Sequence, residues 1–329
     1  MKRILVTGGA GFISSNMIRY LLTRTQHDVV TMDALTYAGN KANLDDVLGH
    51  ERLRFIEGDI RNVEDVAMAL EGVDVIVNAA AESHVSKSIE EGGSEFVTTN
   101  VVGTQVLLDA MREHTVERFI LISSSEVYGT AVTDPMDENH PLNPRSPYAG
   151  TKAGGDRLAY SYWCTYGLPI TVLRPFNNYG PYQHPEKVIP RFVTQALRHD
   201  KLSVHGDGRA SRDWLFVEDT CRAITAAVEA PLERIAGQVI NVATGEDIDV
   251  QTIAERVCDA LGRPRSMIEH GSDRPGQVDR HIGSTDRARE LLGFEAKIGF
   301  DRGLERTIRW YRDNPAWWAG LYQRAPQTA

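Results

Sequence analysis

The sequence is poor in cysteine and contains no long hydrophobic run. Its three cysteines, Cys164, Cys221 and Cys258, are far apart and form no CxxC or Cys/His cluster, which excludes a disulfide scaffold and argues against a metal site. Reduced, unpaired thiols are typical of cytoplasmic proteins. No stretch approaches the roughly 18 apolar residues that a membrane helix needs, and the apolar run after the first three residues is too short for a signal peptide. We therefore expect a cytoplasmic protein with no membrane segment and no metal.

Positive charge is also in short supply. The chain has 36 Lys and Arg against 45 Asp and Glu, a net charge of −9. Nucleic-acid backbones bind basic surfaces, so we expect no nucleic-acid partner. A hydrophobic content of 42% and a charged content of 25% over 329 residues are those of an ordinary globular protein. Disorder is excluded, and the length fits two domains or one large α/β fold.

Short apolar segments recur through the first half, with helical patterns between them. Strands buried on both faces of a parallel sheet are apolar throughout rather than alternating. An apolar stripe at four-residue spacing from Ile13 to Leu21 predicts an amphipathic helix between the first two strands. This alternation predicts βαβ units and an α/β fold with a doubly wound parallel sheet. The predicted strands are Ile4–Thr7, Val29–Asp33, Arg54–Glu57, Val75–Asn78, Phe119–Ser123 and Ile170–Leu173.

The amino-acid composition changes after about residue 176. Glycine, proline and aromatic residues cluster over 174–191, and 206–214 has the composition of a loop. Residues 239–242 predict another strand, which we expect to return to the first sheet. Asp249 predicts the cap of a helix that ends before Gly262, and a further helix over 286–292 ends at Gly293.

We therefore expect two domains. Residues 1–175 would form a dinucleotide-binding domain, and 176–329 a smaller substrate-binding domain, with about 212–245 returning to the first. Four aromatic residues near the C-terminus are expected to pack on the body of the protein or at an oligomer interface: Trp310, Tyr311, Trp317 and Trp318.

A glycine-rich turn, TGGAGFI at residues 7–13, joins the first predicted strand to the first helix. Gly8 and Gly11 suit a tight turn that brings backbone N–H groups close to a pyrophosphate at the helix N-terminus. Asp33, which ends the second strand, can accept hydrogen bonds from ribose hydroxyls and would repel a 2′-phosphate. The pattern therefore predicts a Rossmann site for NAD rather than NADP. The other predicted cofactor-binding residues follow the turn or the third and fourth strands: Phe12, Ile13, Asp59, Ile60, Ala79 and Ala81.

A second group of residues, Ser124, Tyr148 and Lys152, predicts a catalytic site. Tyr148 and Lys152 are spaced i and i+4, so on a helix they share one face, and Ser124 follows the fifth strand. A phenol with a pKa of about 10 is a poor base at neutral pH. A neighbouring ammonium and an oxidised nicotinamide should both lower that pKa. We predict that Tyr148 takes a proton from a sugar hydroxyl that Ser124 also holds.

Taken together, these residues resemble the extended short-chain dehydrogenase/reductase family, which acts on nucleotide sugars. The turn at 7–13, the YxxxK pair at 148–152 and the chain length carry the resemblance. It implies NAD as cofactor, a nucleotide-diphosphate sugar (dTDP or UDP) as substrate, and a homodimer. Narrower motifs are similar to those of dTDP-glucose 4,6-dehydratases: LTYAGN at 35–40, AESHV at 81–85, EVYG at 126–129, NNYGPY at 177–182, PEKVIP at 185–190 and RDW at 212–214.

The same resemblance implies residues for substrate binding. A dianionic diphosphate on an acidic protein requires a local pocket of Arg and Lys. The implied substrate-binding residues are Ser83, Asn178, Lys187, Arg212, Asn241, Arg274 and Arg280.

The sequence departs from the dTDP-glucose dehydratases at position 125. Those enzymes carry an Asp-Glu pair where this chain has Ser125-Glu126. By the resemblance, the Glu removes the C5 proton of a 4-keto sugar and the Asp protonates the departing C6 hydroxyl. A serine hydroxyl is far too weak an acid for the second role.

Two readings of Ser125 remain open. GDP-sugar dehydratases also pair Ser with Glu, so elimination without the Asp is possible. Nucleotide-uronate decarboxylases carry the same pair, and their substrate has a C6 carboxylate that an Asp would repel. We expect oxidation at C4 followed by 4,6-dehydration, with decarboxylation of a nucleotide hexuronate as the alternative. C4 epimerisation and a non-catalytic, NAD-responsive regulator are further alternatives.

Overall fold

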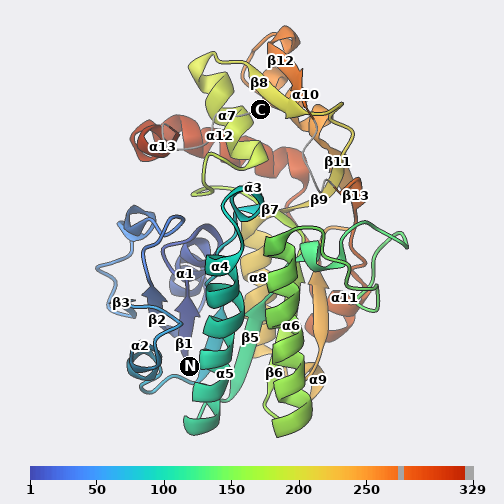
Figure 1. Ribbon diagram of the computed structural model, residues 1–329. Coiled ribbons are helices and arrows are strands. Elements are labelled where there is room, and N and C mark those ends of the chain that lie inside the picture. Colours follow the sequence, from blue (N-terminus) through green and yellow to red (C-terminus); the bar gives the residue numbers. More distant parts are fainter. Residues whose placement is uncertain (273–277, 323–329) are drawn as a thin grey trace.

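A seven-stranded parallel sheet forms the centre of the computed structural model, which describes residues 1–272 and 278–322 (Figure 1). The strand order is β10-β6-β5-β4-β1-β2-β3. Successive strands are added on one side of β1 up to β3 and on the other side from β4 onward, so a crevice is expected between the carboxyl ends of β1 and β4. The strands are β1 (Arg3–Thr7), β2 (Asp28–Asp33), β3 (Leu53–Glu57), β4 (Val75–Asn78), β5 (Arg118–Ile122), β6 (Ile170–Pro175) and β10 (Val239–Val242).

The predicted parallel sheet is confirmed. Every strand expected in the first half is present, and no end is displaced by more than two residues. The strand expected at 239–242 is β10, and it pairs in parallel with β6. Hydrophobic patterning found these strands because all but the edge strand β3 are almost wholly buried.

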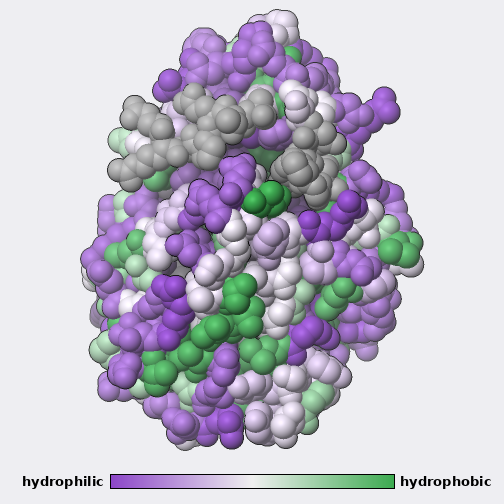
Figure 2. Space-filling view, in the orientation of Figure 1, coloured by the Kyte–Doolittle hydropathy of each residue, from purple (hydrophilic) through white to green (hydrophobic). Residues whose placement is uncertain are grey.

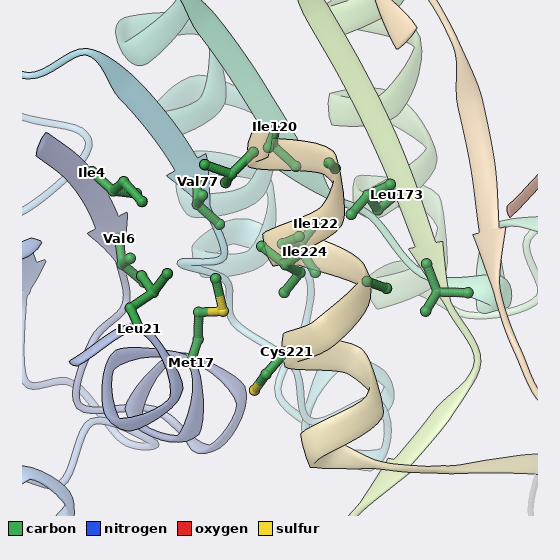
Figure 3. Close-up of a cluster of buried hydrophobic side chains, with 14 of the residues drawn as sticks. Ile4, Val6, Met17, Leu21, Val77, Ile120, Ile122, Leu173, Cys221 and Ile224 are labelled. Carbon is green, nitrogen blue, oxygen red and sulfur yellow. The ribbon is translucent and has the colours of Figure 1, made fainter. Parts of the chain in front are cut away.

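Helices cover both faces of the sheet. On one face, Met17 and Leu21 of α1 and Ile224 of α8 pack against strand residues such as Val6 and Ile120 (Figure 3). A separate buried cluster joins the other face to α2, α5 and α6. The first set is α1 (Phe12–Arg24), α8 (Val217–Glu229) and α11 (Asp286–Leu292), and the second is α2 (Val63–Ala69), α5 (Thr104–Glu113) and α6 (Pro147–Tyr166).

The remaining elements form a second lobe with its own buried cluster, above the carboxyl ends of the sheet in Figure 1. Here β9 lies between β11 and β13 and also pairs with β7, while β8 pairs with β12. The strands are β7 (Asn177–Tyr179), β8 (Leu202–His205), β9 (Ser211–Phe216), β11 (Asp247–Asp249), β12 (Ile268–Gly271) and β13 (Arg280–His281). The helices are α7 (Val188–Arg198), α10 (Val250–Ala260), α12 (Phe300–Asp313) and α13 (Pro315–Tyr322).

The loop expected over 206–214 is partly wrong, because β9 begins at Ser211. Because residues 211–213 are polar, their sequence did not indicate the buried strand that they begin. Asp213 is fully buried, and its carboxylate accepts the backbone N–H groups of Thr244 and Gly245 at 2.9 Å each. Those donors come from the loop that follows β10, so the local pattern of the sequence could not reveal them.

Short helical segments complete the chain. They are η1 (Lys41–Leu44), α3 (Val85–Glu90), α4 (Ser94–Val97), η2 (Thr98–Gly103), η3 (Ser125–Tyr128), α9 (Leu232–Ile235) and η4 (Arg265–Met267). Among residues 1–272 and 278–322, no helix combines the length and apolar character needed to cross a membrane.

Candidate active site

The turn between β1 and α1 has the geometry of an anion site. Gly8 has a φ of +68°, and a side chain there would place Cβ 2.8 Å from the Cα of Ala80. Gly11 begins α1 without a side-chain cap, so the N–H groups of the first helical turn are open to a ligand. Free N–H groups and the positive end of a helix dipole favour a phosphate at this position.

Asp33 stands beside this turn with only 7% of its surface exposed. Its two carboxylate oxygens accept the backbone N–H groups of Ala10 at 2.8 Å and Leu35 at 2.7 Å. Burial raises the pKa of Asp33, while those two hydrogen bonds lower it. The carboxylate is thus fixed where a ribose diol would meet it.

One pocket follows the carboxyl ends of the strands from this turn to α6. Glu82 lines this pocket: the residue is 6% exposed, its Oε1 accepts the Thr36 hydroxyl at 3.1 Å, and its buried Oε2 has no hydrogen-bond partner among the described residues. The glycine cradle and this free carboxylate oxygen fit a dinucleotide with several hydroxyls. All the predicted cofactor-binding residues line the pocket: Gly8, Gly11, Phe12, Ile13, Asp33, Asp59, Ile60, Ala79, Ala81, Tyr148 and Lys152.

The start of α6 places Tyr148 and Lys152 at the far end of this pocket. Ser146 caps the helix by accepting the N–H of Ala149 at 3.1 Å, and Pro147 fills the first helical position. Lys152 is 8% exposed, and its ammonium donates to the Ile122 carbonyl at 2.6 Å. Burial lowers the pKa of Lys152 to about 8, against an opposing effect of nearby Asp156.

Burial is the main influence on the pKa of Tyr148. Burial raises it to about 12, the Ser124 hydroxyl lowers it, and the charge of Glu126 raises it further. A cation bound in the pocket would lower it.

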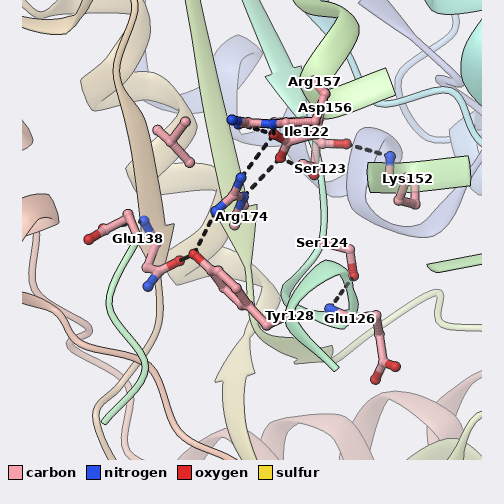
Figure 4. Close-up of polar contacts among 12 residues, drawn as sticks. Ile122, Ser123, Ser124, Glu126, Tyr128, Glu138, Lys152, Asp156, Arg157 and Arg174 are labelled. Atoms are coloured by element: carbon pink, nitrogen blue, oxygen red, sulfur yellow. Dashed lines mark hydrogen bonds and ion pairs between the residues drawn. The ribbon is translucent and has the colours of Figure 1, made fainter. Parts of the chain in front are cut away.

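The end of β5 carries the other predicted catalytic residues. Ser124 caps η3 by accepting the N–H of Glu126 at 3.2 Å (Figure 4). Ser125 is 2% exposed, while Glu126 is half-buried. These three residues directly follow Ser123, which lines the pocket, but they do not line it themselves.

A buried polar network stands behind them (Figure 4). Arg174 donates to the two carboxylate oxygens of Asp156 at 2.8 and 2.9 Å and to the hydroxyl of Tyr128 at 2.9 Å. That hydroxyl donates in turn to Asn241 at 2.7 Å. Asn241 lies on β10, is fully buried, and gives its remaining amide to the carbonyl of Met136. Asn241 therefore supports the sheet from within, and its place among the substrate-binding residues stays a prediction.

The other implied substrate residues divide into two groups. Ser83 and Lys187 line the pocket, and the Lys187 ammonium donates to the Ser83 carbonyl at 3.2 Å. Asn178 is half-buried and does not line the pocket, and its amide donates to the Phe176 carbonyl at 2.9 Å. Arg212 is 6% exposed on β9.

Arg280, on β13 opposite Ser211 of β9, forms ion pairs with Asp247 and Asp134. Arg274 lies outside the described residues. Asn178, Arg212, Arg274 and Arg280 remain predictions as ligands of the diphosphate.

Sequence reasoning missed a cluster that joins the two lobes. The Glu186 carboxylate contacts the hydroxyl of Tyr37, His84 at 3.1 Å, His184 at 3.3 Å and Lys187 at 3.3 Å. Tyr37 and His84 follow β2 and β4, whereas His184 and Glu186 precede α7. The PEKVIP and AESHV motifs contain most of these residues, but nothing local pairs the two segments.

Known proteins resemble this chain over nearly its whole length. A family described as GDP-mannose 4,6 dehydratase matches residues 5–307. The chain belongs to this family. The family resemblance read from the sequence, to nucleotide-sugar enzymes of the extended short-chain dehydrogenase/reductase type, is confirmed.

Individual proteins and solved structures are also similar to this chain. A low-salt glycan biosynthesis protein, Agl12, of Haloferax volcanii is 45% identical, with 94% of this chain and 98% of that protein aligned. The dTDP-glucose 4,6-dehydratase of Streptomyces niveus is 43% identical over 97% and 95%. Among solved structures, dTDP-glucose 4,6-dehydratase from Streptomyces venezuelae, with NAD bound, has a TM-score of 0.92 and 43% identity over 97% of this chain and 99% of that one. UDP-glucuronic acid 4-epimerase from Bacillus cereus, with UDP-glucuronic acid and NAD bound, has a TM-score of 0.90 and 30% identity over 94% and 99%.

Proposed function

We propose that this protein is an NAD-dependent 4,6-dehydratase of a dTDP-hexose. The observation that carries the proposal is one pocket with the glycine turn and Asp33 at one end and Tyr148 with Lys152 at the other. That arrangement holds a dinucleotide so that its redox end meets a phenol. When bound, NAD supplies an acceptor for the hydride of sugar C4 and a donor that returns it at C6.

The chain's own residues handle the protons of the oxidation. Tyr148 takes the proton of the C4 hydroxyl, and Ser124, whose hydroxyl interacts with the Tyr148 phenol, holds the same sugar oxygen. Lys152, with a pKa of about 8, is mostly cationic at neutral pH and lines the same pocket as Tyr148.

Elimination then needs a base near C5. The 4-keto group acidifies the C5 hydrogen, and Glu126, half-buried on η3, removes it as a proton. The C6–O bond breaks as the C5–C6 double bond forms, and the proton held by Glu126 leaves with the hydroxyl as water. Ser125 supplies no acidic proton, so one carboxyl group serves both steps.

The direct test is incubation with dTDP-glucose followed by the mass of the product. Loss of one water molecule supports the proposal. Tyr148→Phe should lower turnover by about 10²–10⁴-fold, the usual worth of a positioned acid–base group, while NAD binding remains. Normal NAD binding without turnover of any candidate sugar would contradict the proposal and favour a regulator, and a C4 epimer as the product would favour an epimerase.

Position 125 favours a second candidate, decarboxylation of a nucleotide hexuronate. Ser125 lies next to Glu126 and offers no charge against a C6 carboxylate, whereas an Asp there would repel it. The same assay with dTDP- and UDP-glucuronate distinguishes the two. Loss of carbon dioxide from a glucuronate, with no water lost from dTDP-glucose, would overturn the first proposal.

We also propose that residues 1–175 bind NAD and that 176–329 bind the nucleotide sugar, apart from β10, which joins the first sheet, and α8 and α11, which pack on it. The described cysteines are unpaired, and this supports a cytoplasmic location.

The helices α5 and α6 support a homodimer. They lie side by side in Figure 1, and apolar side chains gather over α5 and its neighbours in Figure 2. Val102 before α5 is 40% exposed, and Tyr160 and Tyr166 on α6 are 41% and 48% exposed. Exposed apolar surface of this kind marks protein interfaces, so we propose that two copies associate through this face.

The dimer can be tested by light scattering after size exclusion. Val102→Glu should shift the protein toward monomer, because it places a charge in the apolar face. Val132→Glu is the matched control, since Val132 is 70% exposed on a loop away from these helices. A wild-type protein that is monomeric at all concentrations would contradict the dimer.

A further inference from the structure

The C-terminal helix α13 reaches back to the glycine-rich turn. The indole Nε1 of Trp317 donates to the Asn43 side chain at 2.8 Å, and the Asn43 amide donates to the Ala10 carbonyl at 2.7 Å. Ala10 lies in the turn itself, and its N–H holds Asp33. Two hydrogen bonds therefore connect the last described helix of the chain to the first turn.

Two faces of α13 have different surroundings. Trp317 and Leu321, one helical turn apart, both line the pocket that the glycine turn opens into. Trp318 points the other way: it is 6% exposed, belongs to the buried cluster of the second lobe, and donates to the Tyr311 carbonyl at 2.7 Å. Trp317 packs at the edge of the same cluster and also faces the pocket, so it connects the core of the second lobe to the pocket wall.

The indole of Trp317 is held in place by further aromatic contacts. Its ring centre lies 4.9 Å from that of Trp310 and 5.9 Å from that of Tyr182. The guanidinium of Arg19, on α1, stacks on Tyr182 at 3.9 Å. These contacts fix the wall to α1, the same helix whose N-terminus faces the pocket.

A second bond between the lobes reinforces this wall. The Asn16 amide, also on α1, donates to the Pro181 carbonyl at 3.0 Å. The segment before α7 and the helix α13 therefore close the pocket on the side of the turn, where a dinucleotide would place its pyrophosphate.

We propose that Trp317 is a cofactor-retaining residue: with Leu321 it forms a wall that slows the escape of the bound dinucleotide. The inference rests on the proposed binding of NAD and concerns the rate of its release. An enzyme that oxidises and then reduces the same sugar needs its cofactor to stay through the cycle. A wall tied to the phosphate turn provides that retention without touching the sugar.

The test measures the release of radiolabelled NAD from the loaded protein during a chase with unlabelled NAD. Trp317→Ala should raise the dissociation rate at least tenfold. Trp317→Phe, which keeps an aromatic ring but loses the bond to Asn43, should raise it less. Tyr322→Phe is the matched control on the same helix, because its hydroxyl contacts Asp200 and the residue does not line the pocket.

Melting temperature separates this role from a structural one. Trp317→Phe should melt with the wild type and still release NAD faster. Release at the wild-type rate from folded Trp317→Ala and Trp317→Phe would overturn the inference alone. A wild-type protein that binds no NAD would overturn the proposed function instead.

Discussion

At the scale of single residues, the reaction that follows C4 oxidation depends on the pair Ser125-Glu126. Ser125 is 2% exposed on the turn that Ser124 caps, so the backbone of η3 holds it next to Glu126. Because the Ser125 side chain is small and neutral, Glu126 is the one carboxyl group that this turn can offer to C5 and C6 of the sugar. A single carboxyl group at this position can act as a base first and an acid afterwards, and this limits how well the C6 hydroxyl can be protonated.

Ser125→Asp should speed the loss of water from dTDP-glucose. A carboxylic acid beside the leaving hydroxyl restores a separate proton donor, and a positioned general acid contributes about 10²–10⁴-fold. We expect at least a tenfold rise in the rate of product formation, measured by mass spectrometry on quenched samples. Ser125→Ala is the control and should leave the rate nearly unchanged. An Asp variant that folds normally but shows no rise would mean that position 125 does not limit elimination.

At the scale of elements, the catalytic helix α6 is positioned by the π-helical turn η2. Asn100 of η2 accepts the N–H of Glu82 and donates to its carbonyl, each at 3.0 Å, and it also donates to Thr151 of α6 at 2.9 Å. One buried amide therefore holds both the backbone of Glu82, which lines the pocket, and the helix that carries Tyr148. Single π-turns within helices occur often at functional sites, because they redirect a side chain without ending the helix.

Two glycines of α6 test this contact. At Gly155 an added Cβ would lie 2.7 Å from the Asn100 carbonyl, whereas at Gly150 it would meet nothing within 4 Å. Gly155→Ala should lower stability by about 1–3 kcal/mol through overpacking, and it should weaken NAD binding because Asn100 moves. Gly150→Ala should raise stability by up to about 1 kcal/mol through helix propensity. Thermal melts and NAD titrations check both, and equal behaviour of the two variants would contradict the role of η2.

At the scale of the whole molecule, the cluster around Glu186 makes the joint between the lobes sensitive to pH. Burial, and after it the charge of Lys187, lowers the pKa of His84 and of His184 to about 4. Both histidines are neutral when native near pH 7. Between about pH 6.5 and 4 the unfolded chain binds protons that the native protein does not, so stability falls as pH falls through this window. Burial also raises the pKa of Glu186, which acts in the opposite direction near the lower end of the window.

His184→Gln should therefore lose less stability than the wild type between pH 7 and pH 5. The His184 imidazole lowers the free energy of unfolding by up to about 1.4 kcal/mol for each pH unit of this window. The melting temperatures of the variant and the wild type should therefore differ by a few degrees at pH 5. Melting curves at pH 7, 6 and 5 measure it. His270→Gln, on the exposed strand β12, is the control and should follow the wild type. If both variants lose stability in parallel with the wild type, the cluster does not sense pH.

The sequence by itself determined the parallel sheet, the glycine turn, Asp33 and the Tyr148–Lys152 pair. Each of these depends on local features, since strand and helix periods, caps and i,i+4 spacing act over a few residues. Only the tertiary structure decided that Asn241 is buried, that Lys152 bonds to the Ile122 carbonyl of β5, and that Trp317 lines the pocket. These outcomes depend on segments far apart in the chain, such as Asn43 and Trp317, whose meeting is set by how the two lobes pack and not by any pattern within either segment.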